Sequence, residues 1–372
     1  MKKTDIISHF SSIKDPRIER QKRHKLIDIF VIAISAVICG ANDWAAIELF
    51  GKSKKAWFKK FLELPHGIPS HDTFGRVFAR LLPQEIKRCF LSWVEAVANI
   101  TEGEIIPIDG KTLRRSYCNE EGKAAIHMVS AWAAQNNLVL GQVKTAEKSN
   151  EITAIPKLLN ILEITGCIVT IDAMGCQKEI ASTILQKGAD YVLALKENQR
   201  TLYEDVKLFL DNAKEKEFKK VRFDFEKTFE KDHGRIENRK YWITSEVNWL
   251  NERHEWEGIR SIGMVESVRT VKGISSKERR YYICSIEADA KLFAKAVRSH
   301  WSIENSCHWI LDMAFREDES RIRTDNGAEN FAFLRHIALN KLKNDTSLKV
   351  GIKNKRLTAG WDNRYLTKLL FG

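Results

Sequence analysis

The alternation of strand and helix patterns between residues 104 and 195 most constrains how this chain can fold. Three segments rich in apolar and β-branched residues come first, and helical and strand patterns then alternate. The expected elements are strands Glu104–Asp109, Ala124–Ala134 and Val139–Thr145, helix Ala154–Thr165, strand Cys167–Asp172, helix Gln177–Lys187 and strand Tyr191–Leu195. Asn136 and Asn137 mark a hairpin turn. This order predicts an α/β fold, with a mixed sheet covered by helices on both faces.

The patterns on either side of this alternation are different. Apolar residues at helical spacing, broken by Gly and Pro, predict an all-helical N-terminal domain. A charged helix and several amphipathic strands predict a β-rich insertion at about residues 200–287, before a helix at Ala288–Met313. The strands expected in the insertion include Arg239–Ile243, Ser261–Val271 and Arg279–Ile286. We therefore expect three parts: 1–100, 101–330 with the insertion, and a basic C-terminal segment at 331–372.

The charge is concentrated at the two ends of the sequence. The whole chain carries +12, with a pI near 9.2. Residues 1–100 hold 17 Lys and Arg against 10 Asp and Glu, and residues 331–372 hold 9 against 2, so each end has a net charge of +7. Basic flanks favour a polyanionic partner such as DNA. Ordinary surface charge that keeps a protein in solution is the alternative.

The longest apolar run and the cysteines indicate a cytoplasmic protein. The run Ile29–Ala41 is too short to span a bilayer and lies close to Asp28 and Asp43, so we expect a buried helix. No secretory signal pattern opens the sequence. The cysteines lack the paired spacing of zinc ribbons, which fits a reducing compartment. They are Cys39, Cys89, Cys118, Cys167, Cys176, Cys284 and Cys307.

Two of the expected strands end in a lone carboxylate. Asp109 follows Ile108, and Asp172 closes the apolar run that begins at Cys167. At the ends of neighbouring strands, both side chains would lie at one open edge of the sheet. Because burial of a lone carboxylate is costly, such a pair suits a hard, oxygen-seeking ion, Mg²⁺ or Mn²⁺. Taken alone, each aspartate also fits an ordinary turn or helix-capping residue.

A third acid is expected from the helix Ala288–Met313. A spacing of four places two histidines and two acids on one face: His300, Glu304, His308 and Asp312. Such a face could hold zinc, but the strand carboxylates favour an oxygen-seeking metal. The two histidines are expected to orient the glutamate or a phosphate rather than to ligate metal. Trp301 and Trp309 are expected in the core.

Several arginines are candidates for contacts with phosphate. Ser70 is a natural N-cap for a helix over His71–Leu82, which carries Arg76 and Arg80 after a turn and could dock in a DNA groove. Helix pairs of this kind are also common in proteins that never bind DNA. In the charge run after Phe315, Arg321 and Arg323 could bind phosphate, or simply form a solvated face.

In combination, these segments resemble the H-repeat-associated insertion-sequence transposases of the DDE class. The resemblance covers nearly the whole sequence, including the helical N-terminal part and the tail. The residues that carry it are Ile108-Asp109-Gly110-Lys111, Thr170-Ile171-Asp172-Ala173-Met174, His233-Gly234-Arg235-Ile236-Glu237, Trp301-Ser302-Ile303-Glu304-Asn305, Phe315-Arg316-Glu317-Asp318, and Lys355, Arg356, Trp361 and Tyr365. An RNase H-like arrangement of the sheet fits the same order of elements.

The resemblance implies a catalytic triad and a reaction. Asp109, Asp172 and Glu304 would hold two Mg²⁺ or Mn²⁺ ions, and the enzyme, a polynucleotidyl transferase and endonuclease, would cut DNA at element ends and join them to target DNA. The alternatives are a metal-dependent nuclease that does not join ends, and a catalytically silent DNA-binding protein. Related enzymes have a Tyr, an Arg and a Lys around the glutamate, where this sequence has Val297, His300 and Leu311.

The resemblance also implies partners and contacts. The partner is double-stranded DNA, both element ends and target, bound by at least a transient dimer in a prokaryotic cytoplasm at the nucleoid, with no membrane involved. The expected DNA contacts are Arg76, Arg80, Lys111, Arg235, Arg298, His300, Arg321, Arg323, Lys355 and Arg356.

Overall fold

The computed structural model describes residues 5–19, 22–117, 124–145, 150–232 and 234–372. Its internal contacts divide the chain into two compact units. Unit one comprises Met1–Asn99, Gly110–Glu147 and Glu304–Gly372, and unit two comprises Ile100–Asp109 and Lys148–Ile303. Both units join segments that are far apart in the sequence. The three-part division expected from the sequence stays a prediction.

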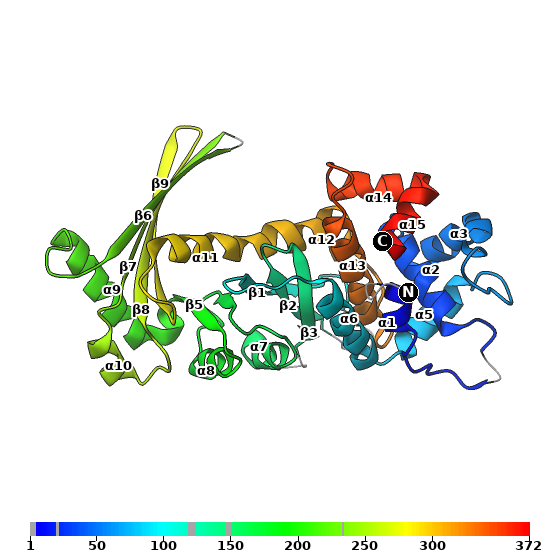
Figure 1. Ribbon diagram of the computed structural model, residues 1–372, viewed down its shortest axis with the longest axis horizontal. Coiled ribbons are helices and arrows are strands. Elements are labelled where there is room, and N and C mark those ends of the chain that lie inside the picture. Colours follow the sequence, from blue (N-terminus) through cyan, green and yellow to red (C-terminus); the bar gives the residue numbers. More distant parts are fainter. Residues whose placement is uncertain (1–4, 20–21, 118–123, 146–149, 233) are drawn as a thin grey trace. The chain divides into compact units, whose positions relative to one another are not determined.

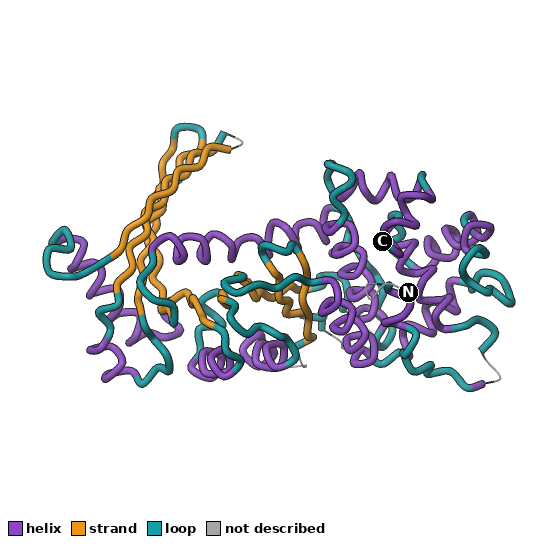
Figure 2. Tube along the Cα trace, in the orientation of Figure 1, coloured by secondary structure: helices purple, strands orange, loops and turns teal. Residues whose placement is uncertain are grey.

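Unit two is built on a mixed sheet. Strand β1, Ile105–Thr112, contributes its residues up to Asp109 and pairs in parallel with β4, which pairs in parallel with β5. The remaining neighbours are antiparallel. The hydrogen-bonded order is β1, β4 (Ile168–Ile171), β5 (Asp190–Leu195), β9 (Ile274–Cys284), β8 (Ser261–Val271), β7 (Arg235–Thr244) and β6 (Asp224–Asp232). Figure 2 shows β6 to β9 as long antiparallel strands, which confirms the predicted strand-rich region.

Helices cover both faces of this sheet. Helix α11, Ala290–Ile303, lies along one face (Figure 1), where its Phe293 packs edge-on against Tyr241 and Tyr282. Gly263 of β8 permits this approach, because a Cβ there would lie 2.5 Å from the Phe293 ring. On the opposite face lie α7 (Glu151–Asn160), α8 (Lys178–Gln186) and α9 (Arg200–Glu215), with η2 (Glu197–Gln199) before α9 and α10 (Asn248–His254) in the insertion. The predicted mixed α/β architecture is confirmed.

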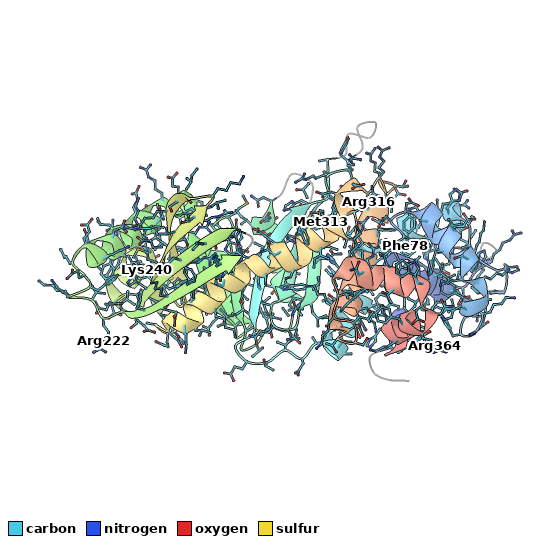
Figure 3. All side chains as sticks on the ribbon, turned by 90° about the horizontal axis from the view of Figure 1, so that it is seen from above. Phe78, Arg222, Lys240, Met313, Arg316 and Arg364 are labelled. Carbon is cyan, nitrogen blue, oxygen red and sulfur yellow. The ribbon has the colours of Figure 1, made fainter. Side chains whose placement is uncertain are left out.

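Unit one is mostly helical. Its hairpin, β2 (His127–Ala133) and β3 (Leu138–Lys144), turns at Asn137, whose φ of 54° suits asparagine. Its helices are α1 (Ile6–Phe10), α2 (Leu26–Ile38), α3 (Trp44–Ser53), α4 (Lys55–Phe58), α5 (His71–Arg80), α6 (Pro83–Val97), η3 (Glu304–His308), α12 (Trp309–Met313), η4 (Glu317–Glu319), α13 (Gly327–Asn344), α14 (Ile352–Trp361) and α15 (Asn363–Phe371). Phe78 of α5, labelled in Figure 3, packs between Phe30 and Trp44.

Several local expectations are confirmed in unit one. The apolar run that begins at Ile29 forms the buried helix α2. The Ser70 hydroxyl accepts a hydrogen bond from the Thr73 amide at 3.4 Å and caps α5. Among the described residues, no helix is both long and apolar enough to cross a bilayer. The six described cysteines are free thiols, and Cys118 lies outside the described residues.

Helix α13 lies at the centre of unit one and is almost entirely buried. Two of its asparagines join it to distant backbone. The side chain of Asn340 accepts from the Val139 amide at 2.8 Å and donates to the Val139 carbonyl at 2.9 Å. Asn330 donates to the carbonyl oxygens of Phe78 at 2.7 Å and Leu81 at 2.9 Å. These bonds satisfy backbone groups that would otherwise be buried without partners.

We predict that Asn340→Ala destabilises unit one. The substitution leaves one buried amide and one buried carbonyl of Val139 unpaired, so the free energy of unfolding should fall by about 2–4 kcal/mol. Asn344→Ala, at an exposed position of the same helix, is the matched control. Urea unfolding followed by circular dichroism measures both variants, and equal stability of the two would contradict this role for Asn340.

Candidate active site

Asp109 and Asp172 are brought side by side in unit two. The parallel register of β1 and β4 pairs Pro107 with Thr170 and Ile108 with Ile171, so the two aspartates follow at the same level of adjacent strands. Neighbouring strands lie about 4.8 Å apart. The structure corrects one detail of the sequence prediction, because Asp109 does not end its strand; β1 continues to Thr112.

The position of the Asp172 carboxylate is fixed by backbone groups. Its Oδ1 accepts hydrogen bonds from the amides of Met174 at 3.0 Å and Gly175 at 3.3 Å. A Cβ at Gly175 would lie 2.3 Å from Ile171, so the chain needs glycine to turn this tightly beneath the aspartate. Asp172 therefore caps the turn, as expected for an aspartate at the end of a strand. These hydrogen bonds orient its carboxylate next to Asp109.

The electrostatic surroundings raise the pKa of Asp172. Burial is the largest cause, and the negative charges of Glu151 and Asp109 add to it, while the Gly175 amide and His300 oppose it. Two carboxylates held this close repel each other, and a divalent cation between them would relieve that repulsion. The donor set of paired, half-buried carboxylate oxygens fits a hard cation such as Mg²⁺ or Mn²⁺.

His300 lies beside the two aspartates. Its Nδ1 is 3.1 Å from the hydroxyl oxygen of Thr170, a polar residue within the otherwise apolar strand β4. Burial lowers the pKa of His300, although Asp109 and Asp172 act in the opposite direction. The imidazole is thus neutral near pH 7 and is placed to orient carboxylates. The sequence analysis assigned no role to Thr170, although a lone hydroxyl group in an apolar strand was a usable signal.

Glu304, the third predicted acid, belongs to unit one. It is exposed and begins the π-helical turn η3. Such turns are rare and occur frequently at functional sites. The wider turn interrupts the regular face predicted from a spacing of four, and His308 is buried instead. Among the described residues, no group of three or more His, Cys, Asp or Glu could hold a metal ion, so the three-acid ligand set is a proposal.

The surroundings of two tryptophans and of Lys111 differ from those expected from the sequence. Trp309 was expected in the core, but it is 60% exposed, and Met313, labelled in Figure 3, is 62% exposed. Trp301 is partly buried, with the guanidinium of Arg280 5.1 Å above its ring. Lys111 was expected to contact DNA, but it lies in an ion-pair cluster within unit one.

The Lys111 cluster joins β1 to the segment that follows α12. Lys111 pairs with Asp312 and, at 2.7 Å, with the fully buried Glu317, which also pairs with Arg335 of α13 at 3.5 Å. Burial alone would raise the pKa of Glu317, but the positive charges of Lys111 and Arg335 hold it at about 2. Sequence reasoning missed this cluster, because Lys111 and Glu317 are 206 residues apart.

The other basic residues expected to bind DNA fall into two groups. In the first, the charge already has a partner: Arg298 pairs with Glu230 at 2.8 Å and Arg235 with Glu237 at 3.1 Å. Lys355 and Arg356 are buried, with Lys355 donating to the Leu342 carbonyl at 2.9 Å and Arg356 to the Val37 carbonyl at 2.7 Å. Lys355 and Arg356 are therefore not exposed in this structure, and their expected contact with DNA stays a prediction. The second group, Arg76, Arg80, Arg321 and Arg323, lines one cavity of unit one.

Known proteins are similar to this chain over almost its whole length. The family model described as "Transposase DDE domain" matches residues 100–341, and the model described as "DDE_Tnp_1-associated" matches residues 7–94. The "H repeat-associated putative transposase YhhI" of Escherichia coli K12 is 41% identical over 99% of this chain and 98% of its own. The chain belongs to the DDE transposase family.

A second relative also carries the name of a transposase. The "Putative transposase YncI" of Escherichia coli O157:H7 is 42% identical over 98% of this chain and 94% of its own. The resemblance to H-repeat-associated transposases predicted from the motifs is thereby confirmed. A solved piggyBac transposase synaptic complex with hairpin DNA aligns with 13% identity and a TM-score of 0.45, over 98% of this chain and 79% of that chain. A likeness this slight assigns neither fold nor function.

We predict that Glu317→Gln destabilises the protein and changes its response to acid. Removing the buried carboxylate leaves the buried Arg335 without its carboxylate partner and Lys111 with Asp312 and Asp318 alone, which should lower the free energy of unfolding by about 3–5 kcal/mol. A carboxylate whose pKa is depressed in the folded state stabilises the protein above its unfolded pKa of about 4.3, and this stabilisation is lost as pH falls toward 2. The Glu317→Gln variant should lack this part of the loss of stability at acid pH.

The measurement is denaturant unfolding at several pH values between 7 and the acid limit of folding. Glu319→Gln, which removes an exposed carboxylate two residues away, is the control and should behave as wild type. A Glu317→Gln protein with the stability and acid dependence of the control would refute the cluster's role.

Proposed function

We propose that this protein is a DDE transposase that cleaves DNA at insertion-sequence ends and joins the freed ends to target DNA, with divalent metal as cofactor. The observation that carries the proposal is the placement of Asp109 and Asp172 at one level of the parallel strands β1 and β4. Membership of the family supplies the reaction class. The coarse architecture, a mixed sheet between helices, is compatible with it.

Asp109, Asp172 and Glu304 would hold two Mg²⁺ or Mn²⁺ ions. When bound, such ions activate water or a DNA 3′-hydroxyl and stabilise the leaving oxygen during in-line attack at phosphorus. The chain's own contribution is to position the oxygen donors. The amides of Met174 and Gly175 fix Asp172, and neutral His300, hydrogen-bonded to Thr170, lies beside both aspartates without adding a competing positive charge.

The finer fold and the partners belong to the same proposal. The parallel order β1, β4 and β5 and the antiparallel hairpin β2–β3 support an RNase H-like core. The helices α1 to α6 would form the transposase-associated domain that precedes it. Double-stranded DNA is the proposed substrate, bound at the nucleoid by a dimer or larger assembly, because two element ends must be joined.

We predict that Asp109→Asn, Asp172→Asn and Glu304→Gln each abolish cleavage, by about a thousandfold or more, while DNA binding persists. The carboxylates act at the reacting phosphorus, whereas affinity comes mainly from basic residues elsewhere. The assay incubates each protein with labelled DNA carrying the element ends and Mg²⁺ or Mn²⁺, and resolves cut and joined products. Glu163→Gln, at an exposed position of unit two, is the matched control.

Each outcome of this assay discriminates among the functions. Cut and joined products from wild type, lost in all three variants, support a transposase. Cutting without joining identifies a nuclease, and binding without cutting identifies a silent DNA-binding protein. Full-rate cleavage by Asp109→Asn would remove this residue from the active site.

A further inference from the structure

One cavity of unit one collects arginines from two distant segments. Its volume is about 600 Å³, and it lies between α5 and the loop after η4. Helix α5 contributes Arg76 and Arg80, and the loop contributes Arg321 and Arg323. All four were separate expectations from the sequence, and the fold brings them around a single space.

The loop is tied to the end of α5 by backbone and asparagine contacts. The Asn326 amide donates to the Ala79 carbonyl at 3.2 Å, and its side chain donates to the Leu81 carbonyl at 3.2 Å. Asn330 donates to the same Leu81 carbonyl at 2.9 Å. The two pairs of arginines are therefore held in a fixed relation within unit one.

The guanidinium groups of this cavity lack carboxylate partners. The guanidinium groups of Arg80 and Arg321 make no hydrogen bond or ion pair to any residue that the structure describes. Arg76 donates only to the Asp72 carbonyl at 3.2 Å, and Arg323 donates to the Arg115 carbonyl at 2.9 Å and lies 4.9 Å over the Tyr117 ring. In contrast, Arg235 and Arg298 of unit two both pair with glutamates.

Three acids also line the cavity, but they leave these charges unneutralised. Asp43 caps α3 by accepting from the Ala46 amide at 2.7 Å, and Asp72 lies 3.5 Å from the Nε2 of His71. Asp325 is the third. Within the described part of the chain, no carboxylate oxygen comes within 4 Å of the four guanidiniums. Apart from the two backbone carbonyl contacts of Arg76 and Arg323, the guanidinium donors that line the cavity thus have no protein acceptor among the described residues.

A second cavity, of about 590 Å³, shares Arg76 and Arg80 with the first. Its other lining residues include Arg17, Arg23 and His24, and its described lining contains no acid. Arg17 is paired with Asp15 at 2.8 Å, whereas Arg23 is exposed. Because Arg76 and Arg80 line both cavities, basic side chains continue along α5 from one cavity to the next, a basic track that suits a row of anions better than a single ion.

We propose that Arg76, Arg80, Arg321 and Arg323 bind successive phosphates of one strand of duplex DNA along this track. The planar guanidinium matches phosphate in geometry and keeps its charge at any physiological pH. Contacts to phosphate fix the position of the duplex without reading its sequence. This inference rests on the proposed function in one respect, namely that DNA is the substrate, and it assigns the binding to particular residues of unit one.

The test compares two charge-matched double variants. Arg80→Ala with Arg321→Ala removes the two arginines that have no internal contact, so the fold should be kept. Lys59→Ala with Lys60→Ala removes the same charge from an exposed part of unit one that does not line the cavity. Fluorescence anisotropy without divalent metal measures binding to an element-end duplex and to a scrambled duplex at several salt concentrations, and thermal melting verifies the folded state.

The arginine variant should bind both duplexes about 10–100-fold more weakly at low salt. Its slope of log affinity against log salt should fall by about 2, since each lost phosphate contact contributes about 0.9. The lysine control should stay within about twofold of wild type. Equal losses in the two double variants, or a loss confined to the element-end duplex, would overturn the proposal.

Two further comparisons show which ligand the arginines bind and which of the two proposals has failed. Inorganic phosphate is added as a competitor; if it protects wild type but not the arginine variant from thermal unfolding while duplex binding is unchanged, the track holds a small anion and the proposal fails. The readout is binding alone. Failure of cleavage with binding intact would therefore count against the proposed transposase reaction and leave the phosphate track standing.

Discussion

The parallel pairing of β1 with β4 is the constraint on which the candidate site depends. Parallel neighbours place equivalent residues at the same level, so Asp109 and Asp172, 63 positions apart in sequence, become adjacent. Both strands are buried up to the residue before the aspartate. The sheet thus supplies rigid, dry support beneath two carboxylates at its edge, where an ion or a phosphate could approach.

The Lys111 cluster organises a separate region, within unit one. Gly110 and Lys111 directly follow Asp109 in β1, and Lys111 binds Asp312 and Glu317. Burying these charges costs desolvation, and well-packed apolar residues are often as stable. An ionic cluster is directional, however, so it fixes the end of β1 and the segment after α12 in one arrangement. Arg335 and neutral His336, whose pKa burial lowers to about 4, complete its surroundings.

Local patterns predicted most of the elements, and long-range contacts account for what was missed. The strand Ser261–Val271 and the Ser70 cap were predicted as found, because alternation and capping depend on neighbours in sequence. Lys355 and Arg356 were expected to contact DNA, but both side chains are buried and donate to carbonyl oxygens of other helices, which no local pattern could show. Trp309 was expected in the core but is exposed. A sequence pattern identifies an apolar side chain, but it does not show whether another segment packs against it.

The asparagine contacts of α13 have a consequence for folding during synthesis of the chain. Asn330 bonds to Phe78 across 252 residues, and Asn340 to Val139 across 201. During synthesis, α2, α5 and the β2–β3 hairpin leave the ribosome long before the helix that buries them. Chaperone binding would therefore be expected at these early segments, and shortened products that end before α13 should aggregate rather than persist as competing DNA-binding fragments.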